Sequence, residues 1–258
     1  MLPNFLKPYQ TKFSNLIRLG RKSDGGYVID KRVINKTNVI ITCGLEAEWS
    51  FESHFQKCNK NCKILAFDHT VDKKFWLKRF SRNFISLIFF KKPSQITDFF
   101  KFFEYLVFFR GKNKHFLKKI VSKKTNNNNQ ITITDAIGNN TKIVLKIDIE
   151  GDEYKILKEI NKNSDKLNLV IIEFHNLQKN LKKIENFISK TKLKNIHINA
   201  NNFGMVDEFG IPQVIEMTLI NPNKFKIKNK KTRRKYPIKG LDFKNRKRGK
   251  EIQITFDK

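Results

Sequence analysis

Short apolar runs rich in β-branched residues alternate with helical patterns along this 258-residue chain, and no other feature of the sequence restricts its fold as strongly. Residues 39–43, 63–67 and 143–149 have the length and composition of buried strands. Apolar side chains at helical spacing follow the first and the third run, over residues 48–57 and 154–160. Repeated strand–helix–strand units of this kind predict an α/β fold with a mostly parallel sheet.

The same pattern continues through the second half of the chain. Residues 169–174, 196–200 and 214–220 are further expected strands, and a helix is expected over 178–189. A last short strand is expected over 251–256. In sheets of this class, ligands bind at the carboxyl ends of the strands, near the point where the strand order reverses. The residues that follow each strand are therefore the first candidates for a functional site.

Three segments are expected from the composition. Residues 1–30 form a lead-in, residues 31–222 form the main domain, and residues 223–258 form a basic extension. An insertion rich in Phe and Lys spans about residues 75–130 of the main domain, and it contains an expected amphipathic helix over 96–109. This region is expected to pack beside the sheet or to cap the site.

The ends of the first two strands favour an adenosine-containing cofactor without phosphates. Asp68 follows the second strand, where a carboxylate can accept both hydroxyl groups of a ribose, although an acid here can also cap a helix. The loop after the first strand has one glycine, Gly44, and then Glu46, whereas a dinucleotide fingerprint needs three glycines. No phosphate-binding loop of the GxxxxGK[ST] type is present. The acidic loop suits the ammonium group of S-adenosylmethionine better than it suits a phosphate.

Acidic residues and a histidine end the next two strands. Asp148 and Glu150 would lie on one face of a strand, where two like charges are costly unless they bind a cation, an amine or hydroxyl groups. Their oxygens also match the ligands of Mg²⁺, although one such pair fits many roles. Glu173 and His175 are again two residues apart, and a histidine beside a carboxylate can act as a general base. Capping of the following helix explains Asp152 and Glu153.

Nine segments between residues 16 and 220 carry a resemblance to a known family. They are 18–20 (RLG), 24–28 (DGGYV), 44–52 (GLEAEWSFE), 66–68 (AFD), 131–137 (ITITDAI), 145–153 (LKIDIEGDE), 170–175 (VIIEFH), 197–202 (HINANN) and 212–216 (PQVIE). In this order they resemble the FkbM-type methyltransferases, a family within the class I S-adenosylmethionine-dependent superfamily. The segment KIDIEG at 146–151 is the most specific.

The resemblance implies a Rossmann-like, seven-stranded, mostly parallel sheet with helices on both faces. It also implies methyl transfer from S-adenosylmethionine to a hydroxyl group of a sugar, glycan or related small molecule. The residues that it assigns to cofactor binding are Asp24, Gly25, Gly44, Leu45, Glu46, Asp68 and Asp148. Asp148 and Glu150 would face the reacting centre, with His175 as the base and Glu173 orienting it. The chain departs from the family at Glu46, where a small residue is common, and at Asn199, where histidine is frequent.

The strongly basic composition keeps other functions open. Lys and Arg total 53 against 24 Asp and Glu, a net charge of +29, and residues 224–250 hold 14 Lys or Arg. A basic face of this kind favours an anionic partner, and a nucleic-acid methyltransferase is the first alternative. A catalytically inactive module that docks on anionic lipid or glycan is the second. A coding bias towards Lys, Asn, Ile and Phe would give the same charge without any such partner.

The location of the protein is predicted from what its sequence lacks. The first residues, MLPNFLKP, have no apolar core of a signal peptide, and the most apolar stretch, 99–109, is shorter than the roughly 20 residues of a bilayer span. The three cysteines, Cys43, Cys58 and Cys62, do not form a disulfide framework and favour a reducing compartment. We therefore expect a cytoplasmic protein, or one that is peripheral to a membrane.

Overall fold

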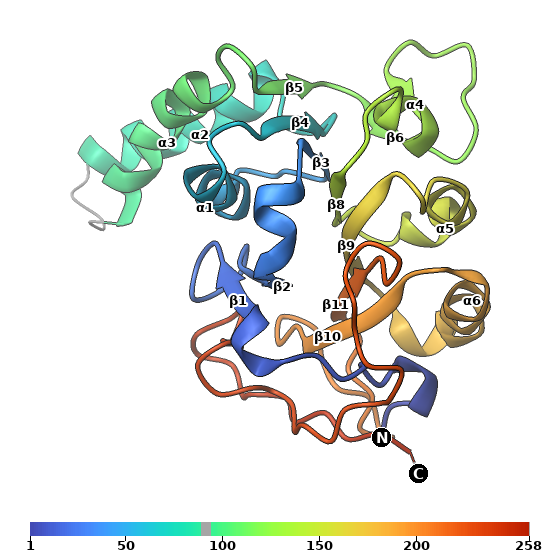
Figure 1. The fold of residues 1–258 in the computed structure, drawn as a ribbon. Helices are drawn as coiled ribbons and strands as arrows, with labels where there is room; N and C mark the ends of the chain where they lie inside the picture. The colour runs from blue at the N-terminus through green and yellow to red at the C-terminus, as the bar shows by residue number, and fades with distance from the viewer. Residues whose placement is uncertain (89–93, 258) are drawn as a thin grey trace.

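A seven-stranded sheet forms the centre of the computed structural model, which describes residues 1–88 and 94–257 (Figure 1). The strand order is β10-β11-β9-β8-β3-β4-β5. Every neighbouring pair is parallel except the two pairs that β11 makes, with β9 and with β10. The strands are β3 (Val39–Cys43), β4 (Lys63–Phe67), β5 (Lys114–Phe116), β8 (Ile143–Ile147), β9 (Leu167–Phe174), β10 (Lys194–Ala200) and β11 (Ile215–Ile220). This is the Rossmann-like class I methyltransferase architecture, so the predicted fold class is confirmed.

Helices cover both faces of this sheet, as expected. Helix α1 (Ser50–Cys58) lies on one face, and the helices α4 (Ile133–Ile137), α5 (Glu153–Lys162) and α6 (Leu177–Lys190) lie on the other (Figure 1). Every residue of β3, β8 and β9 is buried, which is the burial that a parallel sheet covered on both sides requires. Helix α5 buries Ile156, Leu157 and Ile160, whose spacing places them on one side of the helix.

The Phe-rich insertion forms a helical pair beside the sheet. Helices α2 (Lys73–Ile88) and α3 (Ser94–Phe108) pack against each other on the side of α1 (Figure 1). A second apolar cluster joins them to the sheet through Trp49 and Trp76, with Phe102 and Tyr105 packed against it. The expected amphipathic helix is therefore present as α3. Residues 89–93 of the expected insertion lie outside the described part of the chain.

The lead-in contains elements that the sequence did not predict, and the last expected strand is absent. The lead-in contains a hairpin of β1 (Leu16–Leu19) and β2 (Tyr27–Asp30), followed by the 3-10 helix η3 (Lys31–Lys36). The strand expected over 251–256 is not formed, because the segment makes only isolated bridges, between Ile254 and Tyr236 and between Phe256 and Leu2. Its neighbours there are irregular segments and not a strand edge, so no ladder extends.

Short elements complete the fold. The 3-10 helices η1 (Asn4–Leu6) and η2 (Phe13–Asn15) precede the hairpin. The two-residue strands β6 (Lys119–Ile120) and β7 (Gln130–Ile131) pair with each other on either side of the Asn-rich loop. Within residues 1–88 and 94–257, no helix is both long enough and apolar enough to cross a bilayer.

Candidate active site

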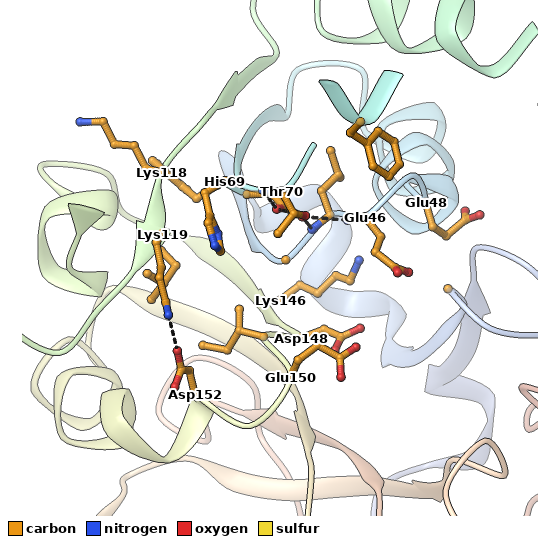
Figure 2. A pocket seen from close by; sticks show the side chains of 18 of the residues that line it. Glu46, Glu48, His69, Thr70, Lys118, Lys119, Lys146, Asp148, Glu150 and Asp152 are labelled. Carbon is orange, nitrogen blue, oxygen red and sulfur yellow. Dashed lines mark hydrogen bonds and ion pairs between the residues drawn. The ribbon is translucent and has the colours of Figure 1, made fainter. Parts of the chain in front are cut away.

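A cavity of about 580 Å³ opens at the carboxyl ends of β3, β4 and β8. The strand order runs outward from β3 in one direction through β4 and in the other through β8, so this is the point where the order reverses. The loops after these three strands line the cavity, together with the hairpin turn around Asp24 and with residues 118–120 (Figure 2). Its volume is within the range of small-molecule sites, roughly 300–1,000 Å³.

The cavity brings together all the residues to which the resemblance assigns cofactor binding. Those that line it are Asp24, Gly25, Gly44, Leu45, Glu46, Asp68 and Asp148, and Glu150 lines it as well. His175 and Glu173 are not among its lining residues, although His175 lies 4.0 Å from Asp148. Lys146 and Tyr27 also line the cavity, and sequence reasoning missed both.

Gly44 lets the loop after β3 touch the end of β8. Its φ is +81°, and a Cβ at this position would lie 1.6 Å from the carbonyl oxygen of Asp148. The Asp148 amide in turn donates to the Cys43 carbonyl at 2.9 Å. Only glycine combines this backbone conformation with so close an approach. The single glycine of the loop therefore sets the distance between two walls of the cavity.

Asp68 holds two loops of the cavity together. One carboxylate oxygen accepts hydrogen bonds from the amides of Leu45 and Glu46, at 2.8 and 2.9 Å. The other accepts from the amide and the hydroxyl of Thr70, at 2.7 and 2.6 Å. Burial alone would raise the pKa of Asp68, but these hydrogen bonds outweigh it and keep the pKa below its usual value. The carboxylate is thus ionised and fully bonded, since two oxygens offer about four acceptor positions.

Acids gather on one side of the cavity, beside the Lys146 ammonium, and Lys119 pairs with Asp152 at 3.2 Å on the other side (Figure 2). The carboxylates of Glu46, Asp148 and Glu150 point to the same side, and Lys118 and Lys119 extend on the opposite side. Burial raises the pKa of Glu46, and the nearby charges of Glu150 and Asp24 raise it further. Burial also raises the pKa of Asp148, to about 7. Burial is the main cause of both shifts, and the neighbouring acids Glu150 and Asp24 add to each of them.

The geometry after β8 differs from the predicted one. The strand ends at Ile147, so Asp148 and Glu150 do not share a strand face, contrary to the expectation from alternation. Glu150 has a positive φ of 53°, and its side chain is 81 % exposed. The chain turns here into α5 through Gly151, whose φ is +102°. The two acids still come together in the cavity, but a turn and not a strand brings them there.

A buried ion pair supports the floor of the cavity. The Lys146 ammonium lies 3.2 Å from an oxygen of Glu52, and the same oxygen accepts the Thr42 hydroxyl at 2.7 Å. Burial would lower the pKa of Lys146, but the charges of Glu52 and Asp148 outweigh it and raise the pKa. The only signal in the sequence was a lysine inside an otherwise apolar strand, which needs a buried partner.

His175 sits among carboxylates. Its Nδ1 lies 3.4 Å from Glu153, while its Nε2 lies 3.4 Å from Glu150, 3.8 Å from Glu173 and 4.0 Å from Asp148. Burial would lower the pKa of His175, but Glu153 and the other acids outweigh it and raise the pKa. Glu153 is buried and held by the amides of His175 and Gly151, each at 2.7 Å. The carboxylate that faces Nδ1 is therefore Glu153, which the sequence had suggested only as a helix-capping residue.

Three of these side chains could also hold a metal ion. Asp148, Glu173 and His175 each offer one ligand atom, and these atoms lie within 4.8 Å of one another. Sequence reasoning had paired Asp148 with Glu150 for Mg²⁺, and Glu150 is not part of this set. Carboxylates with an imidazole fit Mn²⁺ or Zn²⁺ better than they fit Mg²⁺.

Buried amides organise the acids at the ends of β9 and β11. Asn201 donates to Glu173 at 2.8 Å, and Asn199 donates to Glu216 at 3.1 Å. Asn245, from the basic extension, donates to Glu216 at 2.7 Å and to Asp24 at 3.1 Å. The distant ends of the chain therefore meet at the site, which no local sequence pattern could reveal.

Comparisons with known proteins found likenesses among solved structures. No protein-family model and no curated protein matches the sequence. The solved fibrillarin/Nop5p complex contains a similar chain, at 12% identity over 72% of this chain and 73% of that chain, with a TM-score of 0.40. Precorrin-6y C5,15-methyltransferase from Geobacter metallireducens is similar at 10% identity over 74% and 87%, with a TM-score of 0.37. TYW2 of M. jannaschii in complex with AdoMet is similar at 12% identity over 74% of each chain, with a TM-score of 0.32. The fold assignment itself rests on the strand order.

Proposed function

We propose that this chain is an S-adenosylmethionine-dependent O-methyltransferase acting on a hydroxyl group of a sugar, glycan or related small molecule. The observation that carries the proposal is the acidic side of the cavity at the β3/β8 switch point, formed by Glu46, Asp148 and Glu150. A nucleotide phosphate would be repelled there, whereas a ligand with a sulfonium and an ammonium group would be attracted. The resemblance to FkbM-type methyltransferases points to the same cofactor and to a hydroxyl acceptor.

The residues present fit this cofactor. Leu45 and Phe67 give the cavity apolar surface for an adenosyl group, and Asp68 with Thr70 forms its polar edge, where ribose hydroxyls can exchange for the Thr70 contacts. The acids Glu46 and Asp148 would face the methionine end. Bound S-adenosylmethionine supplies a methyl group on a sulfonium, and this methyl group is the electrophile.

The chain's own residues would then position and deprotonate the acceptor. In such a transfer the residues of the chain would hold the acceptor oxygen towards the methyl group, and the hydroxyl proton would go to a base supplied by the chain. Most of the rate enhancement would come from holding the hydroxyl in line with the methyl group. His175 is the proposed base through Nε2, with Glu153 orienting Nδ1. Asp148 and Glu150 both line the cavity and lie 4.0 and 3.4 Å from His175 Nε2, so they are the residues that would contact the hydroxyl.

Ligand binding tests the cofactor assignment before any acceptor is known. We expect S-adenosylmethionine to bind in isothermal titration calorimetry, and ATP and NAD to bind at least tenfold more weakly. The variant Glu46→Gln should weaken S-adenosylmethionine binding about tenfold, the cost of one charge-assisted contact. Glu185→Gln, an exposed acid on α6, is the matched control and should change nothing.

Methyl transfer tests the acceptor class. The protein is incubated with methyl-labelled cofactor and separate glycan, lipid and RNA pools, and the label is expected in glycan or another hydroxyl-bearing acceptor. No binding of S-adenosylmethionine would refute the proposed function. Label found only in RNA would replace the acceptor with a nucleic acid.

A further inference from the structure

The loop between β10 and β11 presents four large apolar side chains to solvent. Phe203, Met205, Val206 and Phe209 are all exposed, Met205 by 72 % and Phe209 by 64 %. Scattered exposed apolar residues need no explanation, but several within seven consecutive positions form a patch of the kind that marks an interaction surface. We call residues 203–209 the apolar loop.

Hydrogen bonds within the apolar loop hold its backbone in one conformation, with the apolar side chains exposed to solvent. The Asp207 carboxylate accepts the amides of Phe209 and Ile211, at 3.0 and 2.7 Å. Asp207 also donates its own amide to the Ile211 carbonyl, at 2.9 Å. The backbone further pairs Val206 with Pro212. A loop held by such bonds loses less conformational entropy when it binds than a loop without them.

A basic segment lies directly against the apolar loop. Asn202 donates to the carbonyls of Arg246 and Lys250, at 3.0 and 3.2 Å, and accepts the Arg246 amide at 2.7 Å. The exposed cations of this segment, residues 244–250, are Lys244, Arg246, Lys247, Arg248 and Lys250. The exposed acids of the two segments and their edge are Glu208 and Glu251. The combined surface, which we call the docking face, is therefore both apolar and cationic.

The docking face is attached to the acids of the candidate site. Asn201, which precedes the apolar loop, donates to Glu173 at 2.8 Å. Asn245, within the basic segment, donates to both Glu216 and Asp24. The buried amides of Asn201 and Asn245 therefore connect the docking face to the acids of the candidate site.

We infer that the docking face binds the surface of a bilayer containing anionic lipids, and that the acceptor hydroxyl belongs to a molecule held in that bilayer. Apolar side chains beside Lys and Arg are the combination that interfacial binding requires, because burial of the former adds to attraction of the latter to anionic headgroups. The first half of this inference, binding to the bilayer, depends only on the exposed surface. The second half, an acceptor held in the bilayer, rests on the proposed function.

A second exposed apolar surface, on α3, is an alternative membrane-binding surface and supplies the control variant. Phe100, Phe103 and Val107 are exposed along one side of α3. Helix α3 also reaches the cavity, because Lys101 donates to Glu48 at 3.3 Å, whereas the docking face is bonded to Asp24, Glu173 and Glu216. We expect the docking face to be the surface that binds, because its exposed cations lie beside its apolar side chains.

Vesicle sedimentation of the full-length protein without cofactor tests the first half. We expect binding to phosphatidylcholine vesicles containing a quarter phosphatidylglycerol, and at least tenfold weaker binding to phosphatidylcholine alone. The variant Lys247→Glu with Arg248→Glu should weaken binding tenfold or more, since each cation near an anionic surface changes it roughly fivefold. Phe203→Ser with Phe209→Ser should weaken it similarly, while Phe103→Ser with Val107→Ser on α3 should leave it unchanged. Unaltered thermal unfolding confirms that each variant is folded.

The outcomes separate the two proposals. No binding to anionic vesicles, or binding lost only in the α3 variant, overturns the docking face and leaves the proposed function standing if S-adenosylmethionine still binds. For the second half, methyl label is expected in the organic phase of a lipid extract. Label that appears only in water-soluble acceptors refutes the membrane-held acceptor but keeps the methyltransferase. Vesicle binding without any binding of S-adenosylmethionine would support the docking face and refute the proposed function.

Discussion

Removing the charge of Lys146 should destabilise the whole fold, because it leaves Glu52 charged and alone in the core. Both side chains are nearly inaccessible to solvent, and 3.2 Å separates their charged atoms. At an effective dielectric constant near 20, Coulomb's law gives an attraction of about 5 kcal/mol at that distance. Breaking a buried pair of this kind typically costs about 3–5 kcal/mol of unfolding free energy. We expect Lys146→Met to lose that amount in urea unfolding followed by circular dichroism at pH 7.

The double variant separates charge from packing. Lys146→Met combined with Glu52→Gln removes the stranded charge and keeps an acceptor for Thr42, so its loss should fall to about 1–2 kcal/mol. Lys155→Met removes a cation from an exposed pair with Asp152 and should cost under about 1 kcal/mol. Equal losses in the single and the double variant would show that the stranded charge is not the cause. Cofactor is left out of all samples, so binding to the cavity does not enter the result.

Three further results follow from the site. His175→Ala should lower the methyl-transfer kcat at least 10²-fold, while the Kd of the cofactor changes less than about twofold. Unchanged turnover would show that His175 is not the base. Turnover of the unaltered protein should rise with pH through a midpoint above 6.5, because only neutral His175 accepts a proton and its pKa is raised; a midpoint below 6.5 would contradict this. Gly44→Ala should abolish cofactor binding and cost at least about 2 kcal/mol in thermal unfolding, since the added Cβ meets the Asp148 carbonyl; a variant that binds normally would show that the loop can move.

Much of the sheet could be predicted because buried parallel strands leave a local signature. The apolar runs at 39–43 and 63–67 match β3 and β4 residue for residue, since both faces of these strands are covered. The hairpin of β1 and β2 escaped prediction because its strands have only four residues each and include polar positions such as Arg18. Short strands of mixed polarity resemble loops in sequence.

The candidate site was predictable only where strand ends supply it. Asp68 and Asp148 follow strands, so topology brings them to one edge of the sheet. The contact of Glu153 with His175 depends on how α5 packs beside β9, and the contact of Asn245 with Asp24 depends on a path across the molecule. Such long-range contacts are set by tertiary packing, which a single sequence does not encode locally.

The bonds from Asn245 to Asp24 and Glu216 have a consequence for synthesis of the protein. A growing chain can pair its central strands long before Asn245 has left the ribosome. The acids of the hairpin turn and of β11 then lack this amide partner until the chain beyond residue 245 has emerged. The central sheet can therefore form before the polar network beside the cavity is complete.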